Sequence, residues 1–137
     1  MAPLPVEGTL FAETYRSDAG TAGVGLFCDE PPSRSLFHRL TFDEVWHFYA
    51  GDPLRLVLLD PDGSDREVIL GDGLAQFVVP AGVWQAGELV PGGAWALYGC
   101  TMAPGFTPEC FEGGSVERLL ETHPARAADI ERLGVPG

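Results

Sequence analysis

The sequence contains no lysine and no asparagine, so every positively charged side chain is an arginine. Without lysine, the chain cannot form a lysine Schiff base, which excludes lysine-linked pyridoxal phosphate chemistry. Without asparagine, it offers no N-glycosylation site. Positive charge is scarce as well, and the formal net charge is -12. Such a protein repels phosphate backbones and anionic lipid surfaces, so we expect no nucleic-acid partner and no membrane partner.

Cysteine is also rare, and long apolar runs are absent. Cys28, Cys100 and Cys110 show no C-x-x-C spacing, which favours reduced thiols over a disulfide framework or structural zinc. Cys100 lies in an apolar run and is expected to be a small core residue. No run approaches the length of a membrane span, and residues 1–8 lack the basic and apolar regions of a secretory signal. These features predict a cytoplasmic protein.

What the chain has in quantity is glycine and proline, placed between short apolar segments. Its 18 glycines and 12 prolines punctuate an all-β protein with many turns. We expect a single domain over residues 1–137, with strands over about 9–111 and a short helical tail over about 115–133. Ser115 is expected to cap the first tail helix, and Gly134 to end the second. The predicted strands are 9–16, 22–27, 36–40, 45–49, 55–59, 66–70, 76–79, 84–89 and 94–100.

Three finer expectations concern how these strands are arranged. Phe11, Glu13 and Tyr15 alternate with other residues and should share one face of the first strand. Strands 66–70 and 76–79 are expected in the middle of the sheet. Strands 84–89 and 94–100 are expected to form a hairpin across Val90-Pro91-Gly92-Gly93. Many short strands with regular turns predict a closed barrel or jelly roll.

Two segments carry a resemblance to a known family. The segment 38–51 contains Glu44 and, after six intervening residues, Gly51, and a second segment reads Pro80-Ala81-Gly82-Val83-Trp84-Gln85. Together with Glu7-Gly8, Ala103-Pro104-Gly105-Phe106, Phe111-Glu112 and other segments in the same order, they resemble cupin family five. This resemblance implies a cupin-type double-stranded β-helix, that is, a jelly-roll barrel around a ligand pocket. By analogy with small cupins it also implies a homodimer.

The chain departs from the family pattern in two places. Family members begin with a short helix ahead of a segment His-Pro-Glu-Gly-Gly, whereas this chain starts almost directly at Glu7-Gly8 without that histidine. Metal-binding cupins place a histidine where this chain has Gln85, and Leu36 stands two positions before His38 where a second histidine would be. No organic cofactor is expected. A divalent metal held by His38, Glu44 and Gln85 stays open, although an amide oxygen is a poorer ligand than imidazole.

The same residues suit a site without metal. We expect His38 and Glu44 to contact each other inside the barrel as an acid/base pair whose pKa values both move toward neutrality. Strand alternation turns His47 away from this pocket. His47, His123 and the cysteines are expected to be structural. Seven further residues are expected to line or rim the pocket and bind the ligand: Glu13, Tyr15, Arg16, Arg39, Trp46, Trp84 and Gln85.

These expectations lead to one favoured function and two alternatives. The favoured function is a non-redox isomerase, epimerase or cyclase that acts by His38–Glu44 proton transfer on a polar or ring-shaped metabolite, sugar-like or polyketide-like. The first alternative is a non-catalytic module that binds or senses a small molecule. The second is a metal-dependent enzyme with a reduced ligand set. The support for catalysis at this stage is fold-level analogy.

Overall fold

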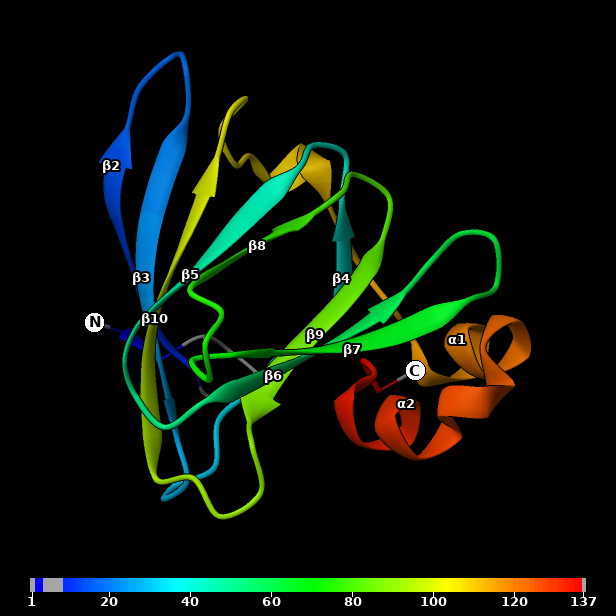
Figure 1. Ribbon diagram of the computed structural model, residues 1–137. Helices are drawn as coiled ribbons and strands as arrows, with labels where there is room; N and C mark the ends of the chain where they lie inside the picture. Colours follow the sequence, from blue (N-terminus) through cyan, green and yellow to red (C-terminus); the bar gives the residue numbers. More distant parts are fainter. Residues whose placement is uncertain (1, 4–8, 137) are drawn as a thin grey trace.

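The computed structural model describes residues 2–3 and 9–136, and in them two antiparallel sheets face each other as a barrel (Figure 1). The predicted segment Glu7-Gly8 lies outside the described residues. The six-stranded sheet has the order β1-β2-β3-β10-β5-β8, and the five-stranded sheet has the order β11-β4-β9-β6-β7. The strands are β1 (Ala2–Pro3), β2 (Leu10–Arg16), β3 (Thr21–Cys28), β4 (Ser35–Leu40), β5 (Glu44–Gly51), β6 (Leu54–Leu59), β7 (Asp65–Leu70), β8 (Gln76–Val79), β9 (Trp84–Leu89), β10 (Trp95–Met102) and β11 (Phe111–Gly113). The predicted all-β jelly-roll barrel is confirmed.

The pairing of the strands differs from two of the predictions. β9 and β10 do not form a hairpin, because β9 pairs with β4 and β6 whereas β10 pairs with β3 and β5. The segment between them is held at its two ends by different neighbours. Val90 donates to the Pro53 carbonyl, and the Ala94 carbonyl accepts from the Asp29 amide. The segment therefore crosses from one sheet to the other, and β7 and β8 lie at sheet edges instead of in the middle.

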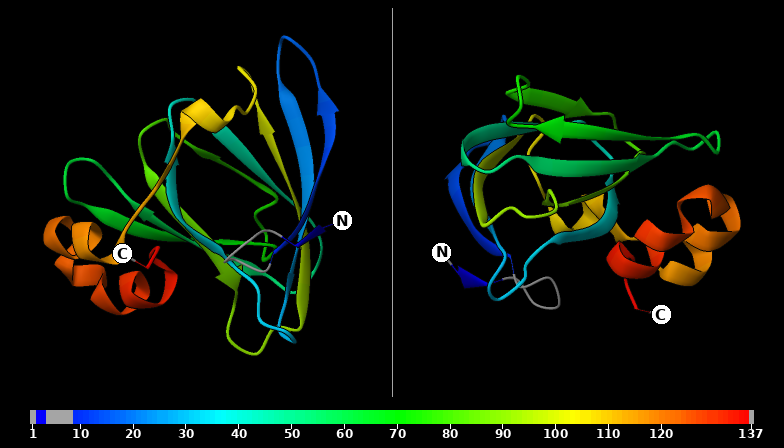
Figure 2. Two further views of the ribbon diagram at one scale, coloured as in Figure 1. Left: turned by 180° about the vertical axis from the view of Figure 1, so that it is seen from behind. Right: turned by 60° about the horizontal axis from the view of Figure 1, so that its bottom comes forward.

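The tail contains two short helices, α1 (Val116–Thr122) and α2 (Ala127–Leu133), joined by the 3-10 turn η2 (Pro124–Arg126). The Ser115 hydroxyl accepts from the Arg118 amide, which confirms the predicted cap, and Gly134 follows the last residue of α2. The helices lie on the outer side of the five-stranded sheet (Figure 2). Within the described part of the chain, no helix has the length and apolar character needed to cross a membrane.

Two apolar clusters divide the interior between the barrel and the tail. The first fills one half of the barrel and includes Phe27, Trp46 and Tyr98. The second lies outside the five-stranded sheet, where Phe37, Trp84 and residues of both helices are buried together. The alternation of β4 and β9 explains this division, since successive side chains on a strand point to opposite faces. One face of this sheet therefore belongs to the barrel interior and the other to the helical tail.

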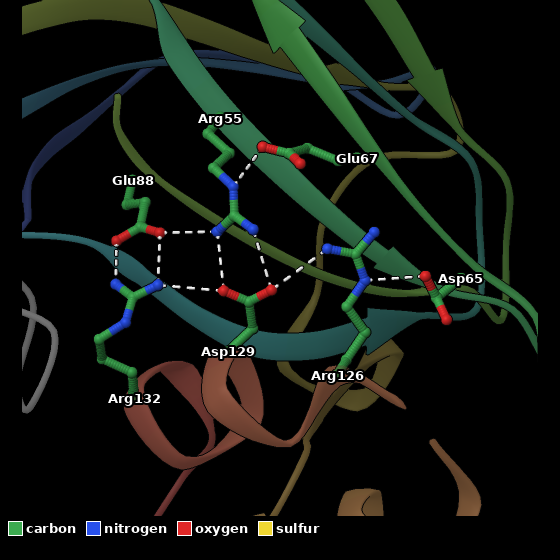
Figure 3. Close-up of polar contacts among 7 residues, drawn as sticks. All are labelled: Arg55, Asp65, Glu67, Glu88, Arg126, Asp129 and Arg132. Carbon is green, nitrogen blue, oxygen red and sulfur yellow. Dashed lines mark hydrogen bonds and ion pairs between the residues drawn. The ribbon is translucent and has the colours of Figure 1, made fainter. Parts of the chain in front are cut away.

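A cluster of ion pairs fastens the tail to the sheet (Figure 3). Its centre is Arg55 of β6, whose guanidinium binds both carboxylate oxygens of Asp129 of α2 at 2.9 Å. Arg55 also binds Glu88 of β9, which in turn binds Arg132 of α2. Asp129 and Arg55 expose only 13% and 14% of their side chains, so this pair is shielded from solvent and salt. Arg126, Asp65 and Glu67 extend the cluster along its edge.

One end of the barrel is open. The β2–β3 hairpin and the segment that follows β10 both extend at this end (Figures 1 and 2). The two are joined by hydrogen bonds, since the Phe106 amide donates to the Thr21 hydroxyl at 2.9 Å and Arg16 donates to the Phe106 carbonyl at 2.8 Å. These contacts form a rim around the half of the barrel that the apolar cluster leaves unfilled.

Candidate functional site

A cavity of about 290 Å³ lies in the open half of the barrel. Trp46 and Tyr98 line it and also belong to the apolar cluster of the filled half, so they form its floor. Its apolar walls include Phe11, Leu40, Met102, Phe106 and Phe111. The polar residues that line it are Glu13, Thr21, Ser35, His38, Glu44 and Cys100. A mostly apolar cavity with a few polar groups is the usual form of a small-molecule site.

The first polar group, Glu44, is positioned by a link between two turns. The Asp43 carboxylate accepts a hydrogen bond from the Ala81 amide at 2.8 Å, which ties the start of β5 to the turn before β9. Gly82 in that turn has a φ of +84°, a conformation that favours glycine. Because the two strands are fixed at this point, Glu44 at the start of β5 comes close to Gln85 of β9.

Glu44 is a carboxylic acid in an apolar wall with one oxygen left without a partner. Its Oε1 is buried and has no hydrogen-bond partner among the described residues. Burial raises the pKa of Glu44 from 4.5 to about 7, and hydrogen bonding to Gln85, Cys100 and Trp46 only partly offsets this rise. At neutral pH the group is therefore shared between its acid and its base form, which suits a group that both takes and returns a proton.

Gln85 holds the inner side of this acid. Its carbonyl oxygen accepts from the Trp46 indole nitrogen at 2.7 Å, so the amide nitrogen is the atom left to donate to Glu44. Gln85 exposes 1% of its surface and lies beneath the cavity wall. Gln85 thereby orients the side chains of Glu44 and Trp46, two residues that line the cavity.

His38 faces the same cavity from the opposite sheet. Its Nδ1 lies 2.8 Å from the Leu36 carbonyl oxygen, which can only accept, so Nδ1 carries the proton and Nε2 is an acceptor. Burial lowers the pKa of His38 below 6.5, which keeps the ring neutral at pH 7. The ring stacks on Phe111 at 5.1 Å between centroids.

His38 and Glu44 do not form the contacting pair that the sequence predicts. They lie on different sheets, β4 and β5, and no hydrogen bond joins these two described residues. Glu44 moves toward neutrality as expected, but burial moves the pKa of His38 in the other direction, away from neutrality. The two groups are separate contact points on one cavity.

Four of the seven predicted ligand-binding residues lie at the cavity or directly support it. Glu13 and Trp46 line it, and Gln85 lies beneath it. Arg16 forms the rim, where its guanidinium binds both carboxylate oxygens of Glu13 at 2.7 and 2.8 Å. The Arg16 hydrogen bonds lower the pKa of Glu13, so this carboxylate is ionised at neutral pH.

The other three predicted ligand-binding residues lie outside the cavity. A β-bulge between Glu13 and Tyr15 changes the register with β3, and Tyr15 is 60% exposed outside the barrel. Arg39 follows His38 on its strand and points to the opposite face, where it pairs with Glu112 at 2.8 Å. Trp84 precedes Gln85 and is buried under the helices with the Arg39 guanidinium 4.5 Å from its ring centroid.

Of the residues expected to be structural, two histidines lie away from the cavity and one cysteine lines it. His47 points outward and binds Thr101 at 2.9 Å, as alternation predicts. His123 is buried, with its Nε2 2.8 Å from the Asp60 carbonyl oxygen. Cys100 packs against the apolar cluster of the barrel, as predicted, and it also lines the cavity beside Glu44, where burial raises the pKa of its thiol. The only sequence signal for the aromatic rim is the presence of Phe106 and Phe111 in the segments that follow β10.

Comparison with known proteins identifies the family. The chain matches the sequence profile described as Cupin superfamily (DUF985), cupin family five, over residues 1–113. The chain belongs to the cupin superfamily. Two solved structures are similar over nearly the whole cupin chain. One is a hypothetical protein from Leishmania major, with 30% identity, a TM-score of 0.86 and coverage of 97% of this chain and 92% of that one.

The second similar structure is a protein from Shewanella oneidensis, with 32% identity, a TM-score of 0.86 and coverage of 96% of this chain and 90% of that one. Oxalate oxidase in complex with the substrate analogue glycolate has 16% identity and a TM-score of 0.62, with coverage of 97% and 74% of the respective chains. At this identity the likeness shows the shared cupin fold alone. No curated protein matches the chain.

The donor set of this cupin does not fit the metal centre that some cupins hold. Of the three predicted ligands, Gln85 uses its carbonyl oxygen to accept from Trp46 and presents an amide N–H group to Glu44. An N–H donor cannot bind a cation. Over residues 2–3 and 9–136, no group of three or more His, Cys, Asp or Glu side chains could hold a metal ion.

Proposed function

We propose that the barrel cavity binds a small organic molecule and that Glu44 transfers protons to and from it, as in a non-redox isomerase, epimerase or cyclase. The observation that carries this proposal is the Glu44 carboxyl group, buried in an apolar wall with Oε1 unpartnered and a pKa of about 7. A structural acid in a core has its oxygens paired, because a buried acceptor without a partner is destabilising.

The two cavity groups have different parts in the proposed reaction. The Nε2 of His38 accepts a hydrogen bond from a ligand hydroxyl and fixes the position of the ligand. Glu44 in its carboxylate form removes a proton from the ligand carbon next to this hydroxyl. Once protonated, Glu44 returns the proton to the same ligand atom or to an adjacent one. Gln85 and Cys100 hydrogen-bond to the carboxyl group and fix its orientation, and the unpartnered Oε1 is the oxygen available to take up the proton. The step needs no oxidant and no external reductant.

Deuterium exchange tests this proposal even though the substrate is unidentified. The protein is incubated in D₂O with a metabolite extract, and compounds that gain deuterium are found by mass spectrometry. We expect one compound class to gain deuterium with the unsubstituted protein. With Glu44→Gln the exchange rate should fall at least about 100-fold, the usual contribution of a proton-transfer group.

Glu117→Gln is the matched control, because it makes the same change on an α1 position away from the cavity. Equal exchange by the Glu44→Gln and Glu117→Gln proteins would contradict the assigned role of Glu44. A compound that binds in the cavity and gains no deuterium would favour a non-catalytic binding module.

A further inference from the structure

The ionisable groups around the cavity provide no positive charge to a ligand. Glu13 and Glu44 are acids, His38 is a neutral ring, and the Cys100 thiol is protonated because burial raises its pKa. None of the described residues that line the cavity is an arginine, and the chain has no lysine. An anionic ligand would therefore meet only neutral or negative groups in a mostly apolar enclosure, where an unpaired charge is strongly disfavoured.

The cation at the rim is already engaged. Arg16 binds Glu13 through two hydrogen bonds, and its Nη2 also donates to the Phe106 carbonyl at 2.8 Å. These contacts use three of the five guanidinium N–H groups, and the positive charge is already paired with the Glu13 carboxylate. A ligand carboxylate or phosphate would have to share this guanidinium with Glu13, and the repulsion between the two anions offsets much of the gain in charge pairing.

The polar residues that line the cavity favour a ligand with a hydrogen-bond donor. The Nε2 of His38 is an acceptor, and the Glu44 carboxyl group is an acceptor whenever it is ionised. A hydroxyl group satisfies both kinds of contact, because it donates to Nε2 and can accept from Glu44 in its protonated form. The hydroxyls of Thr21 and Ser35 line the same cavity and can serve a second polar group of the ligand.

The shape of the cavity favours a flat, ring-bearing compound. Trp46 and Tyr98 stack with 5.0 Å between centroids on the floor, and the His38 ring stacks on Phe111 at 5.1 Å. An apolar protein cavity of about 150 Å³ holds one benzene molecule. The cavity here has about 290 Å³, which leaves space for one or two rings with small substituents.

From these observations we infer that the cavity takes a compound of one or two rings that carries at least one hydroxyl group and no negative charge, and that it rejects carboxylates and phosphates. The inference rests on the proposed function in one respect, namely that the cavity is the ligand site. It narrows the expected metabolite from a polar or ring-shaped molecule, sugar-like or polyketide-like, to a mainly apolar ring alcohol or phenol.

Three probes that share one ring system test the inference by calorimetric titration at pH 7.5. They are 2-naphthol, which is neutral, 2-naphthoate, which is an anion, and 2-naphthylmethylamine, which is a cation. We expect 2-naphthol and the ammonium compound each to bind at least about tenfold more tightly than 2-naphthoate, since burying an unpaired negative charge is costly. Binding of 2-naphthoate as tight as that of 2-naphthol, or binding of none of the three, would overturn the inference.

Two variants show whether the cavity is responsible. Glu44→Gln removes the buried acid without changing its shape, and it should raise the affinity for 2-naphthoate while 2-naphthol still binds. Ser35→Phe places a ring in the cavity and should abolish 2-naphthol binding, with thermal unfolding as the check that the variant is folded. Unchanged binding by both variants would place the probe elsewhere and overturn the inference.

The two proposals fail in different ways. Retained preference for 2-naphthol without any deuterium exchange would contradict the proposed catalysis and leave the ligand class standing. Deuterium exchange on a carboxylate or phosphate compound, lost in Glu44→Gln, would support the catalysis and contradict the ligand class.

Discussion

Glu44 lines the cavity with a carboxyl group whose two oxygens have different surroundings. The carboxyl group is hydrogen-bonded to Gln85 and Cys100, whereas its Oε1 is buried without a partner among the described residues. Burial dominates, so the protonated form is favoured up to about neutral pH. The same feature that makes Glu44 useful for proton transfer has a cost for folding, because ionising the group inside the barrel is unfavourable.

This cost predicts how stability depends on pH. The pKa of Glu44 is raised from 4.5 to about 7 in the folded protein, so the folded state binds more protons than the unfolded state between these values. The stability that this group contributes is fully present below pH 4.5 and is lost as pH rises through about 7. The difference amounts to about 3 kcal/mol. Urea unfolding of the unsubstituted and Glu44→Gln proteins at pH 5 and pH 8 measures it.

We expect the unfolding free energy of Glu44→Gln, measured relative to that of the unsubstituted protein, to be higher at pH 8 than at pH 5. Comparing the proteins as a difference removes the contribution of the other titrating groups, which both share. A difference in unfolding free energy that stays constant over this pH range would mean that Glu44 has an ordinary pKa.

The predictions for the site residues are correct where side chains alternate regularly along a strand. This alternation places Glu44 and Trp46 inside the barrel and His47 outside, as the structure confirms. The prediction for Tyr15 is wrong because a bulge after Glu13 adds a residue to the strand, and a one-residue shift moves a side chain to the other face. The position of Cys100 at the cavity could not be predicted, because an apolar strand does not reveal where the barrel is left unfilled.

At the scale of elements, the strands and helices follow from local pattern, whereas their pairing does not. The predicted tail helices end within about two residues of α1 and α2, because caps and turns are local signals. The prediction of a hairpin between β9 and β10 is wrong. The segment 90–94 has a good turn sequence, but it crosses from one sheet to the other. Pairing is set by contacts with Pro53 and Asp29, which are distant in sequence.

The Arg55–Asp129 pair links α2 to the sheet, beside the buried side chains of Ile130 and Leu133. The Arg55 guanidinium is the main cause of the lowered pKa of Asp129, so this acid contributes stability above its ordinary pKa of 3.8 and loses it as pH falls through the lowered value. Asp129→Asn leaves Arg55 largely shielded and short of one partner. We expect a loss of about 2 kcal/mol in unfolding free energy at pH 7.

The exposed Glu13–Arg16 pair provides the control for this measurement. Its side chains are 39% and 50% exposed, so Glu13→Gln should leave the unfolding free energy within experimental error. Equal effects of Asp129→Asn and Glu13→Gln in chemical denaturation would show that the cluster of Figure 3 does not fasten the helix.

At the scale of the whole molecule, the charge is unevenly distributed. The outward-facing residues of β5 and β10 include Val45, His47, Tyr49, Leu97, Gly99 and Thr101, none of which is an aspartate, a glutamate or an arginine. Four exposed large hydrophobic side chains lie on the strands of this sheet: Tyr15, Tyr49, Val78 and Trp95. In a protein with a net charge of -12, two copies can approach with least repulsion through such a face.

We therefore expect a homodimer through the outer face of the six-stranded sheet, with the two helical tails far from the contact. Sedimentation equilibrium should give the mass of two chains. Val78→Glu places a charge on an exposed position of β8 and should shift the protein to a single chain. A monomeric unsubstituted protein, or a dimer unaffected by Val78→Glu, would contradict this assignment.

A direct titration of Glu44 tests whether the cavity contains a carboxyl group that exchanges a proton near neutral pH, as the proposed function requires. The protein is labelled with ¹³C at the glutamate side-chain carboxyl carbons, and Glu44 is assigned by its loss in the Glu44→Gln spectrum. We predict a midpoint of about pH 7 for this signal, in line with its burial. A midpoint near the ordinary glutamate value of 4.5 would contradict the account.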